Sequence, residues 1–190
     1  MSPRTAYIIV FFAANLVVAG SITDLDEQLY TQIHNRWKSD FGDLYFGAVN
    51  ELGSTEFVLA ANLGIMAFGD SSARTAAKLA SVGLAAAMLT TQILKCVVGR
   101  PRPDDPDCPR CKSSFPSGHA TAAFTMAYIY GAEYPKYRIP LYAAAFSVAL
   151  ARIYLGRHYP SDVLAGAAVG TAAGFVVMKN RDFIVEFRLW

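Results

Sequence analysis

Charged residues are scarce in this chain. Asp, Glu, Lys and Arg make up 17% of its 190 residues, against about 25% in typical soluble domains. The formal net charge is +2 and no dense basic run is present, so the charge pattern gives no indication of nucleic-acid binding. The length suits a single domain, residues 1–190.

Cysteine and histidine are also rare, with three of each. Cys108 and Cys111 form one C-x-x-C pair, and Cys96 is the third cysteine. A structural zinc site would need a second pair, so the sequence predicts no metal, and no other cofactor is expected. A short-range disulfide between Cys108 and Cys111 and two free thiols are both compatible with the pattern.

Instead of charged residues, the chain contains six long segments without any Asp, Glu, Lys or Arg. They cover residues 5–22, 57–69, 79–94, 113–132, 139–151 and 163–178. A spanning helix needs about 20 mostly apolar residues, so the shorter segments cross a bilayer only if flanking charged residues reach the headgroups. Six such segments favour an all-α, polytopic membrane protein with a six-transmembrane-helix bundle over a soluble helical core.

The first segment has an alternative interpretation. Arg4 precedes it, and Val18-Ala19-Gly20 resembles a signal-peptide cleavage site. Residues 23–52, which follow, are polar and aromatic. Their apolar residues recur at helical spacing, at Leu25, Leu29, Ile33 and Trp37. Thr23 and Asp26 resemble a capping box. The pattern predicts a short amphipathic segment on the membrane surface, with a solvated connector as the alternative, and His34 is interpreted as a surface residue.

Glycines and prolines indicate where several of the remaining spans begin or end. Gly99 and Pro101 are expected to end the third span. Pro116 is expected in the first turn of the fourth span, where free N–H groups of residues 117–119 would attract anions. Pro160 is expected to begin the sixth span, and its glycines recur every four residues as a face for close helix packing. These glycines are Gly166, Gly170 and Gly174.

The basic residues of the short loops indicate the orientation. With six spans, the N-terminus, residues 70–78, residues 133–138 and the C-terminal tail share one face and carry Lys and Arg, as cytoplasmic loops do. The loops at 95–116 and 152–160 lie on the opposite face, yet they also hold many arginines. Phosphate binding would explain them. We therefore expect a multi-pass protein of the cell membrane with its active site on the extracytoplasmic face.

Three polar clusters lie at span boundaries on that face, at residues 95–103, 116–119 and 152–162. Arginine presents a planar fork that matches phosphate oxygens, and lysine adds a point charge; both stabilise a phosphoryl-transfer transition state. A histidine held by a carboxylate is a good nucleophile, and Asp162 lies four residues after His158. A second histidine can donate a proton to a leaving group.

The order and spacing of these residues resemble the signature of the type 2 phosphatidic acid phosphatase superfamily. The signature reads Lys95, six residues, Arg102-Pro103; Pro116-Ser117-Gly118-His119; and Arg152, five residues, His158, three residues, Asp162. The resemblance implies that His158 is the nucleophile, that Asp162 orients it and that His119 is the general acid. It implies phosphate binding by Lys95, Arg102, Ser117, Gly118 and Arg152. Ala151 stands where the family usually has serine.

The resemblance implies an integral-membrane, metal-independent lipid phosphatase that works through a phosphohistidine. The candidate substrates are phosphatidic acid, phosphatidylglycerol phosphate and isoprenyl diphosphates. The expected partners are this lipid phosphate and the lipid bilayer, with no nucleic acid; the oligomeric state stays open. One alternative is a phosphotransferase that passes the phosphoryl group to another lipid or a sugar. A binding or transport protein would not need the paired histidines. Arg100, Arg110 and Arg157 are interpreted as rim or headgroup contacts.

Overall fold

The computed structural model describes residues 23–186, and every regular element within this range is helical. The all-α prediction is therefore confirmed for this part of the chain. Residues 23–31 form a helix that continues into the π-helix η1. The elements that follow are η1 (Gln32–Arg36), α2 (Asp40–Leu52), α3 (Thr55–Phe68), α4 (Ser71–Val98), η2 (Arg110–Lys112), α5 (Gly118–Glu133), η3 (Pro135–Tyr137), α6 (Arg138–Tyr154), α7 (Pro160–Lys179) and α8 (Arg181–Glu186).

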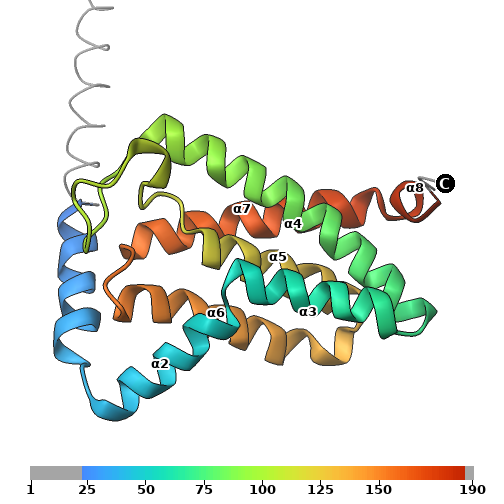
Figure 1. The fold of residues 1–190 in the computed structure, drawn as a ribbon, viewed down its shortest axis with the longest axis horizontal. Helices are drawn as coiled ribbons and strands as arrows, with labels where there is room; N and C mark the ends of the chain where they lie inside the picture. Colours follow the sequence, from blue (N-terminus) through green and yellow to red (C-terminus); the bar gives the residue numbers. More distant parts are fainter. Residues whose placement is uncertain (1–22, 187–190) are drawn as a thin grey trace, which may run out of the picture.

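α5 lies at the centre of the bundle. It packs most extensively against α7, and also against α6, α4 and α3 (Figure 1). One apolar cluster joins α5, α6 and α7 around Phe124 and Ile153, and a second joins α4, α5 and α7 around Leu79 and Ile129. The helix at 23–31 lies across one end of the bundle, beside the long loop after α4 and the short loop before α7 (Figure 1).

Two helices within residues 23–186, α4 and α7, are long and apolar enough to cross a membrane. α3 is apolar but has 14 residues, and α5 and α6 have 16 and 17, so these three reach across a bilayer only with their flanking residues. The segment at 5–22, with its signal-peptide alternative, lies outside the described residues. The six-span count therefore stays a prediction.

Polar caps define where α3 and α4 start and end. The Ser54 hydroxyl accepts a hydrogen bond from the Phe57 N–H at the start of α3, and the Asp70 carboxylate accepts one from the Ala73 N–H at the start of α4. α4 ends at Gly99, whose φ of 65° is left-handed, a conformation that glycine adopts without steric cost. The prediction that Gly99 stops this helix is confirmed.

Two helix starts differ from expectation. Pro116 lies before α5 rather than in its first turn, and Ser117 is the N-cap, whose hydroxyl accepts from the Ala120 N–H. The Ser117 N–H is also not free, because it donates to the Asp162 carbonyl oxygen at 2.9 Å. α6 starts at Arg138, so Pro140 lies within its first turn, where a missing N–H removes no intrahelical bond.

The segment at 23–52 is more structured than a connector. It contains the helix at 23–31, η1 and α2, and Leu25 and Trp37 are exposed, as a membrane-surface helix requires. His34 is not a free surface residue, which corrects the sequence interpretation. Its Nδ1 lies 2.7 Å from the Tyr154 carbonyl oxygen, and its ring packs against Gly156.

The glycines of α7 allow it to approach α5 at backbone distance, as the sequence predicts. A Cβ atom added at Gly166 would lie 2.5 Å from the Ser117 carbonyl oxygen, and one at Gly170 would collide with the Thr121 carbonyl oxygen. At Gly174 the Cβ would lie 2.8 Å from the Tyr128 Cβ. Close contact therefore runs along α7 from its first turns toward its end.

We expect Gly170→Ala to lower the free energy of unfolding by about 1–3 kcal/mol, because overpacking forces the two helices apart. Gly64→Ala is the matched control, since nothing lies within 4 Å of a Cβ at Gly64 in α3. There the better helix propensity of alanine should give a neutral or slightly stabilising change, up to about 1 kcal/mol. Unfolding in detergent measures both. Equal stability of the two variants would contradict the close approach of α5 and α7.

Candidate active site

The eight residues singled out in the sequence all lie at one end of the bundle. α4 carries Lys95 in its last turn, and the loop after it carries Arg102. The start of α5 carries Ser117, Gly118 and His119, and the last turn of α6 carries Arg152. His158 lies in the α6–α7 loop and Asp162 in the first turn of α7. The helix at 23–31 covers this same end (Figure 1).

His158 and Asp162 form a buried pair at the start of α7. Their side chains are 2% and 0% exposed, and the His158 Nδ1 lies 3.6 Å from the Asp162 Oδ2. The same carboxylate oxygen accepts a hydrogen bond of 2.9 Å from the Tyr159 N–H. Asp162 therefore does reach back toward His158, and the other ring nitrogen, Nε2, faces away from the carboxylate.

Burial keeps His158 neutral. Loss of solvent is the largest cause that lowers its pKa to about 4; the neighbouring Asp162 carboxylate opposes this shift, and the positive charges of Arg152 and Lys95 add to it. At pH 7 the imidazole therefore has an unprotonated nitrogen available. Neutral imidazole is the form that can act as a nucleophile.

Lys95 and Arg102 lie against backbone carbonyl groups of the loop that follows α4. The Lys95 ammonium group donates to the Ser113 carbonyl oxygen at 2.5 Å, and the Arg102 Nε donates to the Lys112 carbonyl oxygen at 2.8 Å. Lys95 also interacts electrostatically with Arg102, Arg152 and Asp162. The cations contributed by the first and third clusters thus lie within electrostatic range of one another.

Arg152 is 7% exposed, and its guanidinium group is only partly satisfied. Its Nη1 donates to the Asn50 Oδ1 of α2. Its Nε has no hydrogen-bond partner within residues 23–186, and neither has the His158 Nδ1. These are the two buried side-chain polar atoms in the described part of the chain that lack a partner. The His158 Nδ1 faces the Asp162 carboxylate at 3.6 Å, so the Arg152 Nε is the buried donor that remains for another group that accepts hydrogen bonds.

His119 lies in the first turn of α5 and within electrostatic range of Arg152, His158, Arg102 and Lys95. Ser117 is fully buried, and its N–H bond to the Asp162 carbonyl oxygen ties the second cluster to the third. The first-turn N–H groups of Gly118 and His119 point out of the helix start, as in other anion sites.

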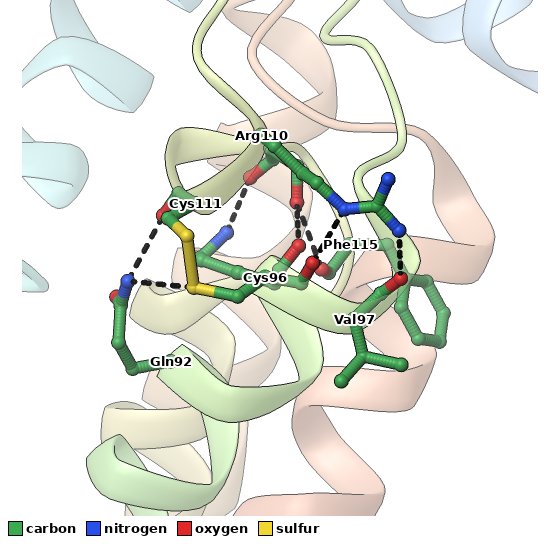
Figure 2. The surroundings of a disulfide bond; sticks show 8 residues. Gln92, Cys96, Val97, Arg110, Cys111 and Phe115 are labelled. Atoms are coloured by element: carbon green, nitrogen blue, oxygen red, sulfur yellow. Dashed lines mark hydrogen bonds between the residues drawn. A yellow bond between two sulfur atoms is a disulfide. The ribbon is translucent and has the colours of Figure 1, made fainter.

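A disulfide holds the loop of the first cluster against α4. It joins Cys96 to Cys111, and Cys108 is free, so neither of the two states expected for a Cys108–Cys111 pair is present. Figure 2 shows that Gln92 and Arg110 reinforce the link. The Gln92 side-chain amide donates to the Cys111 carbonyl oxygen at 3.0 Å, and Arg110 donates to the carbonyl oxygens of Cys96 and Val97.

The arginines outside the motif have different environments. Arg110 binds the last carbonyl groups of α4, and Arg157 forms an exposed ion pair with Asp104 at the rim. The rim interpretation is wrong for Arg100, whose Nη1 donates to the Asp162 Oδ1 at 2.9 Å. Sequence reasoning also missed Asn50, the partner of Arg152. Neither residue carries a local signal, because each partner lies more than 60 positions away.

The described part of the chain has a polar cleft at the site and an apolar groove on the same bundle. A polar cleft of about 390 Å³ lies beside Lys95 and Arg102 and is rimmed by Asp104, Lys112 and Arg157. An apolar groove of about 250 Å³ runs between α5, α6 and α7. Its lining includes Phe124, Ile153, Val163 and Leu164. The groove is lined by apolar residues alone, two of which, Ile153 and Val163, adjoin the site residues Arg152 and Asp162 in the sequence.

Within residues 23–186, no three side chains among His, Cys, Asp and Glu are grouped so that they would hold a metal ion. Apart from Asp162, the charged side chains that act on His158 are the cations Arg152 and Lys95. This donor set suits an anion with several oxygen atoms.

Comparisons with known proteins agree with this chemistry. The model of the PAP2 superfamily matches residues 76–185. Lipid A 1-phosphatase of Rhizobium etli is 36% identical over 93 residues, 43% of this chain and 40% of that protein. Decaprenylphosphoryl-5-phosphoribose phosphatase of Mycobacterium tuberculosis is 38% identical over 109 residues, 52% of this chain and 58% of that protein. The chain thus spans about half the length of these curated relatives.

The fold is also similar to a solved structure. The crystal structure of LpxE from Aquifex aeolicus matches with a TM-score of 0.69 and 27% identity, covering 82% of this chain and 95% of that one.

Proposed function

Because the chain belongs to the PAP2 superfamily, we propose that it is a membrane phosphatase that hydrolyses a phosphomonoester or diphosphate of a lipid through a phosphohistidine, without a metal ion. One observation carries the proposal. The neutral, buried His158 lies beside Asp162 and within range of the cations Arg152 and Lys95, and the buried Arg152 Nε has no hydrogen-bond partner within residues 23–186.

The first step transfers the phosphoryl group to His158. The lone pair of Nε2 attacks phosphorus, an N–P bond forms and the bond from phosphorus to the lipid oxygen breaks. The leaving oxygen takes a proton from His119; burial and the neighbouring cations disfavour its protonated form, and the negative charge of a bound phosphate offsets them. Asp162 stabilises the positive charge that develops on the His158 ring through Nδ1–H. Lys95, Arg102 and Arg152 stabilise the equatorial oxygens.

The second step releases phosphate. Water attacks the phosphohistidine, and His119, now neutral, accepts a proton from it. The N–P bond breaks, its electron pair returns to Nε2, and inorganic phosphate leaves. The proton taken from water replaces the one that His119 gave to the lipid alcohol. Both histidines are then in their starting states, and no redox cofactor takes part.

The shape of the site supports an amphiphilic substrate. A phosphate group would enter the polar cleft beside Lys95 and Arg102, while a hydrocarbon chain would lie in the apolar groove between α5, α6 and α7. The relatives named for lipid A and for a decaprenylphosphoryl sugar phosphate support the same class. The candidates to assay side by side are phosphatidic acid, phosphatidylglycerol phosphate, isoprenyl diphosphates and lipid A.

We propose that the site faces the extracytoplasmic side of a multi-pass membrane protein. The disulfide between Cys96 and Cys111 supports this orientation, because disulfides persist in oxidising compartments and are rare in the cytosol. A thiol reagent that does not cross membranes tests it: labelling of Cys108 in intact cells is expected, and labelling only after lysis would contradict the orientation.

We expect phosphate release from these lipids in detergent to be unchanged by excess EDTA, because cations of the chain itself stabilise the transferred group. Release of inorganic phosphate is the measurement. Loss of activity on chelation, with recovery on adding a divalent cation, would refute the metal-free reaction. Phosphorylation of an added lipid or sugar, without free phosphate, would indicate a phosphotransferase instead.

A further inference from the structure

Arg100 connects the first and third polar clusters although it lies outside the motif. Its side chain is 23% exposed. Its Nη1 donates to the Asp162 Oδ1 at 2.9 Å and to the Ser161 hydroxyl at 2.7 Å. The centre of its guanidinium group lies 4.1 Å from the centroid of the Tyr159 ring, within cation–π range. Its own carbonyl oxygen accepts a hydrogen bond from the Ser114 N–H at 2.8 Å.

Asp26 holds the other side of this guanidinium group. It is 4% exposed, and its Oδ2 accepts a hydrogen bond of 2.8 Å from the Arg100 Nη2. Its Oδ1 accepts from the Ser161 N–H at 2.8 Å, and its Oδ2 also accepts from the Ser161 hydroxyl. Asp26, from the helix at 23–31, therefore binds a first-turn N–H of α7, the helix that carries Asp162. A carboxylate is favoured at this position.

We propose that Arg100, anchored by Asp26, is a positioning residue that holds the Asp162 carboxylate against His158, so that the helix at 23–31 is a working part of the site. This inference rests on the proposed phosphatase function. Arg100 acts through Asp162, and no contact between Arg100 and the phosphate group is invoked.

The geometry of Asp162 shows why it depends on Arg100. The carboxylate is fully buried, and its two oxygens have different partners: Oδ1 binds Arg100, while Oδ2 binds the Tyr159 N–H and faces His158. Without Arg100, Oδ1 would be a buried charged oxygen without this donor, at a considerable energetic cost. The carboxylate would then rotate toward other donors, and Oδ2 would leave the position from which it orients the imidazole ring.

Arginine suits this place better than lysine. The Arg100 Nη1 donates to Asp162 in the first turn of α7, and its Nη2 donates to Asp26. The guanidinium group also lies over the Tyr159 ring. A lysine ammonium group keeps the charge but lacks the planar fork. A lysine at position 100 would therefore keep the positive charge of Arg100 but lose the fixed geometry of its hydrogen bonds.

The test compares kcat and KM for phosphate release in detergent. We expect Arg100→Gln to lower kcat about 100-fold, the loss typical of misplaced reacting groups, with KM changed by less than about threefold since the phosphate-binding cations remain. Arg100→Lys should recover part of this loss. Asp26→Asn, which keeps a hydrogen-bond acceptor but not the charge, should lie between Arg100→Gln and the unmodified protein. An unchanged kcat in Arg100→Gln, or a change in KM alone, would overturn the proposal.

A double variant separates action through Asp162 from a general effect. If Arg100 acts through Asp162, Arg100→Gln should lower kcat little further in an Asp162→Asn background, because interacting residues give non-additive losses. If the fold-losses in kcat of the two single variants instead multiplied in the double variant, the proposal would be overturned. Arg181→Gln is the matched control: Arg181 of α8 forms a comparable pair with Glu133, 2.7 Å apart, at the other end of the bundle. It should lower the melting temperature and leave kcat unchanged.

Melting temperatures of the same variants give a readout that does not need turnover. Arg100→Gln and Asp162→Asn should together lower the melting temperature by less than the sum of their separate effects; additive shifts would overturn the contact. Absence of phosphate release from the unmodified protein would refute the proposed function, whereas an active protein with an unimpaired Arg100→Gln variant would refute the role of Arg100 alone.

Discussion

His158→Ala is expected to lower kcat for phosphate release by on the order of 10⁵-fold, the scale of losing a nucleophile in other hydrolases. In the proposed reaction the His158 imidazole forms the covalent bond to phosphorus, and the other histidine of the site, His119, acts on the leaving group instead. The measurement is release of phosphate from a lipid phosphate in detergent, together with trapping of the phosphorylated protein by an alkaline quench, because the N–P bond of a phosphohistidine survives alkali and is hydrolysed by acid. Both the turnover and the trapped phosphohistidine should be lost.

His34→Asn is the matched control for this experiment. His34 is the third histidine of the chain, and its Nδ1 bonds to the Tyr154 carbonyl oxygen outside the buried pair. An asparagine amide can replace that bond, so the variant should remain active. Retention of full activity by His158→Ala would rule out the phosphohistidine mechanism, whatever the substrate.

The second large effect concerns His119 and depends on the leaving group. His119→Asn should lower kcat for a lipid phosphate ester by about 10³-fold, the usual contribution of a general acid. p-Nitrophenyl phosphate has a leaving group that departs without a proton, so its kcat should fall by only about tenfold or less on the same scale. Parallel assays on the two substrates give the comparison.

Arg152→Lys serves as the control for the leaving-group test. A residue that binds the phosphate oxygens acts on both substrates, so its loss should reduce both rates by a similar factor. If His119→Asn also reduced both rates equally, His119 would bind phosphate and would not be the proton donor.

The helices and the position of the candidate site could largely be predicted from local sequence. Gly99 ends α4 and Pro160 begins α7 as expected, because left-handed φ and a missing N–H are properties of single residues. The glycine spacing of α7 likewise predicted a close approach to α5. The three clusters meet because span boundaries on one face must lie together, which depends only on the number and order of spans.

The contacts that orient these residues could not be predicted in this way. Arg100 and Asp26 are 74 positions apart, and Arg152 and Asn50 are 102 apart. Such pairs depend on how helices rotate about their axes, which hydrophobic periodicity alone does not specify. Asp26 illustrates the problem, because a capping-box pattern with Thr23 explained it locally while its partners lie in α7 and after α4. The disulfide similarly joins Cys96, rather than the nearby Cys108, to Cys111.

The close contact of α5 and α7 has a mechanical consequence. His119 and Asp162 lie near the starts of these two helices, which are joined by the Ser117–Asp162 backbone bond and meet at backbone distance at Gly166 and Gly170. When the thickness or curvature of a bilayer changes, helices respond mainly by tilting, and these two must tilt as one unit. If the chain works as proposed, the spacing of His119 and Asp162 would therefore be insulated from the lipid surroundings, which would act instead on how a substrate enters the bundle.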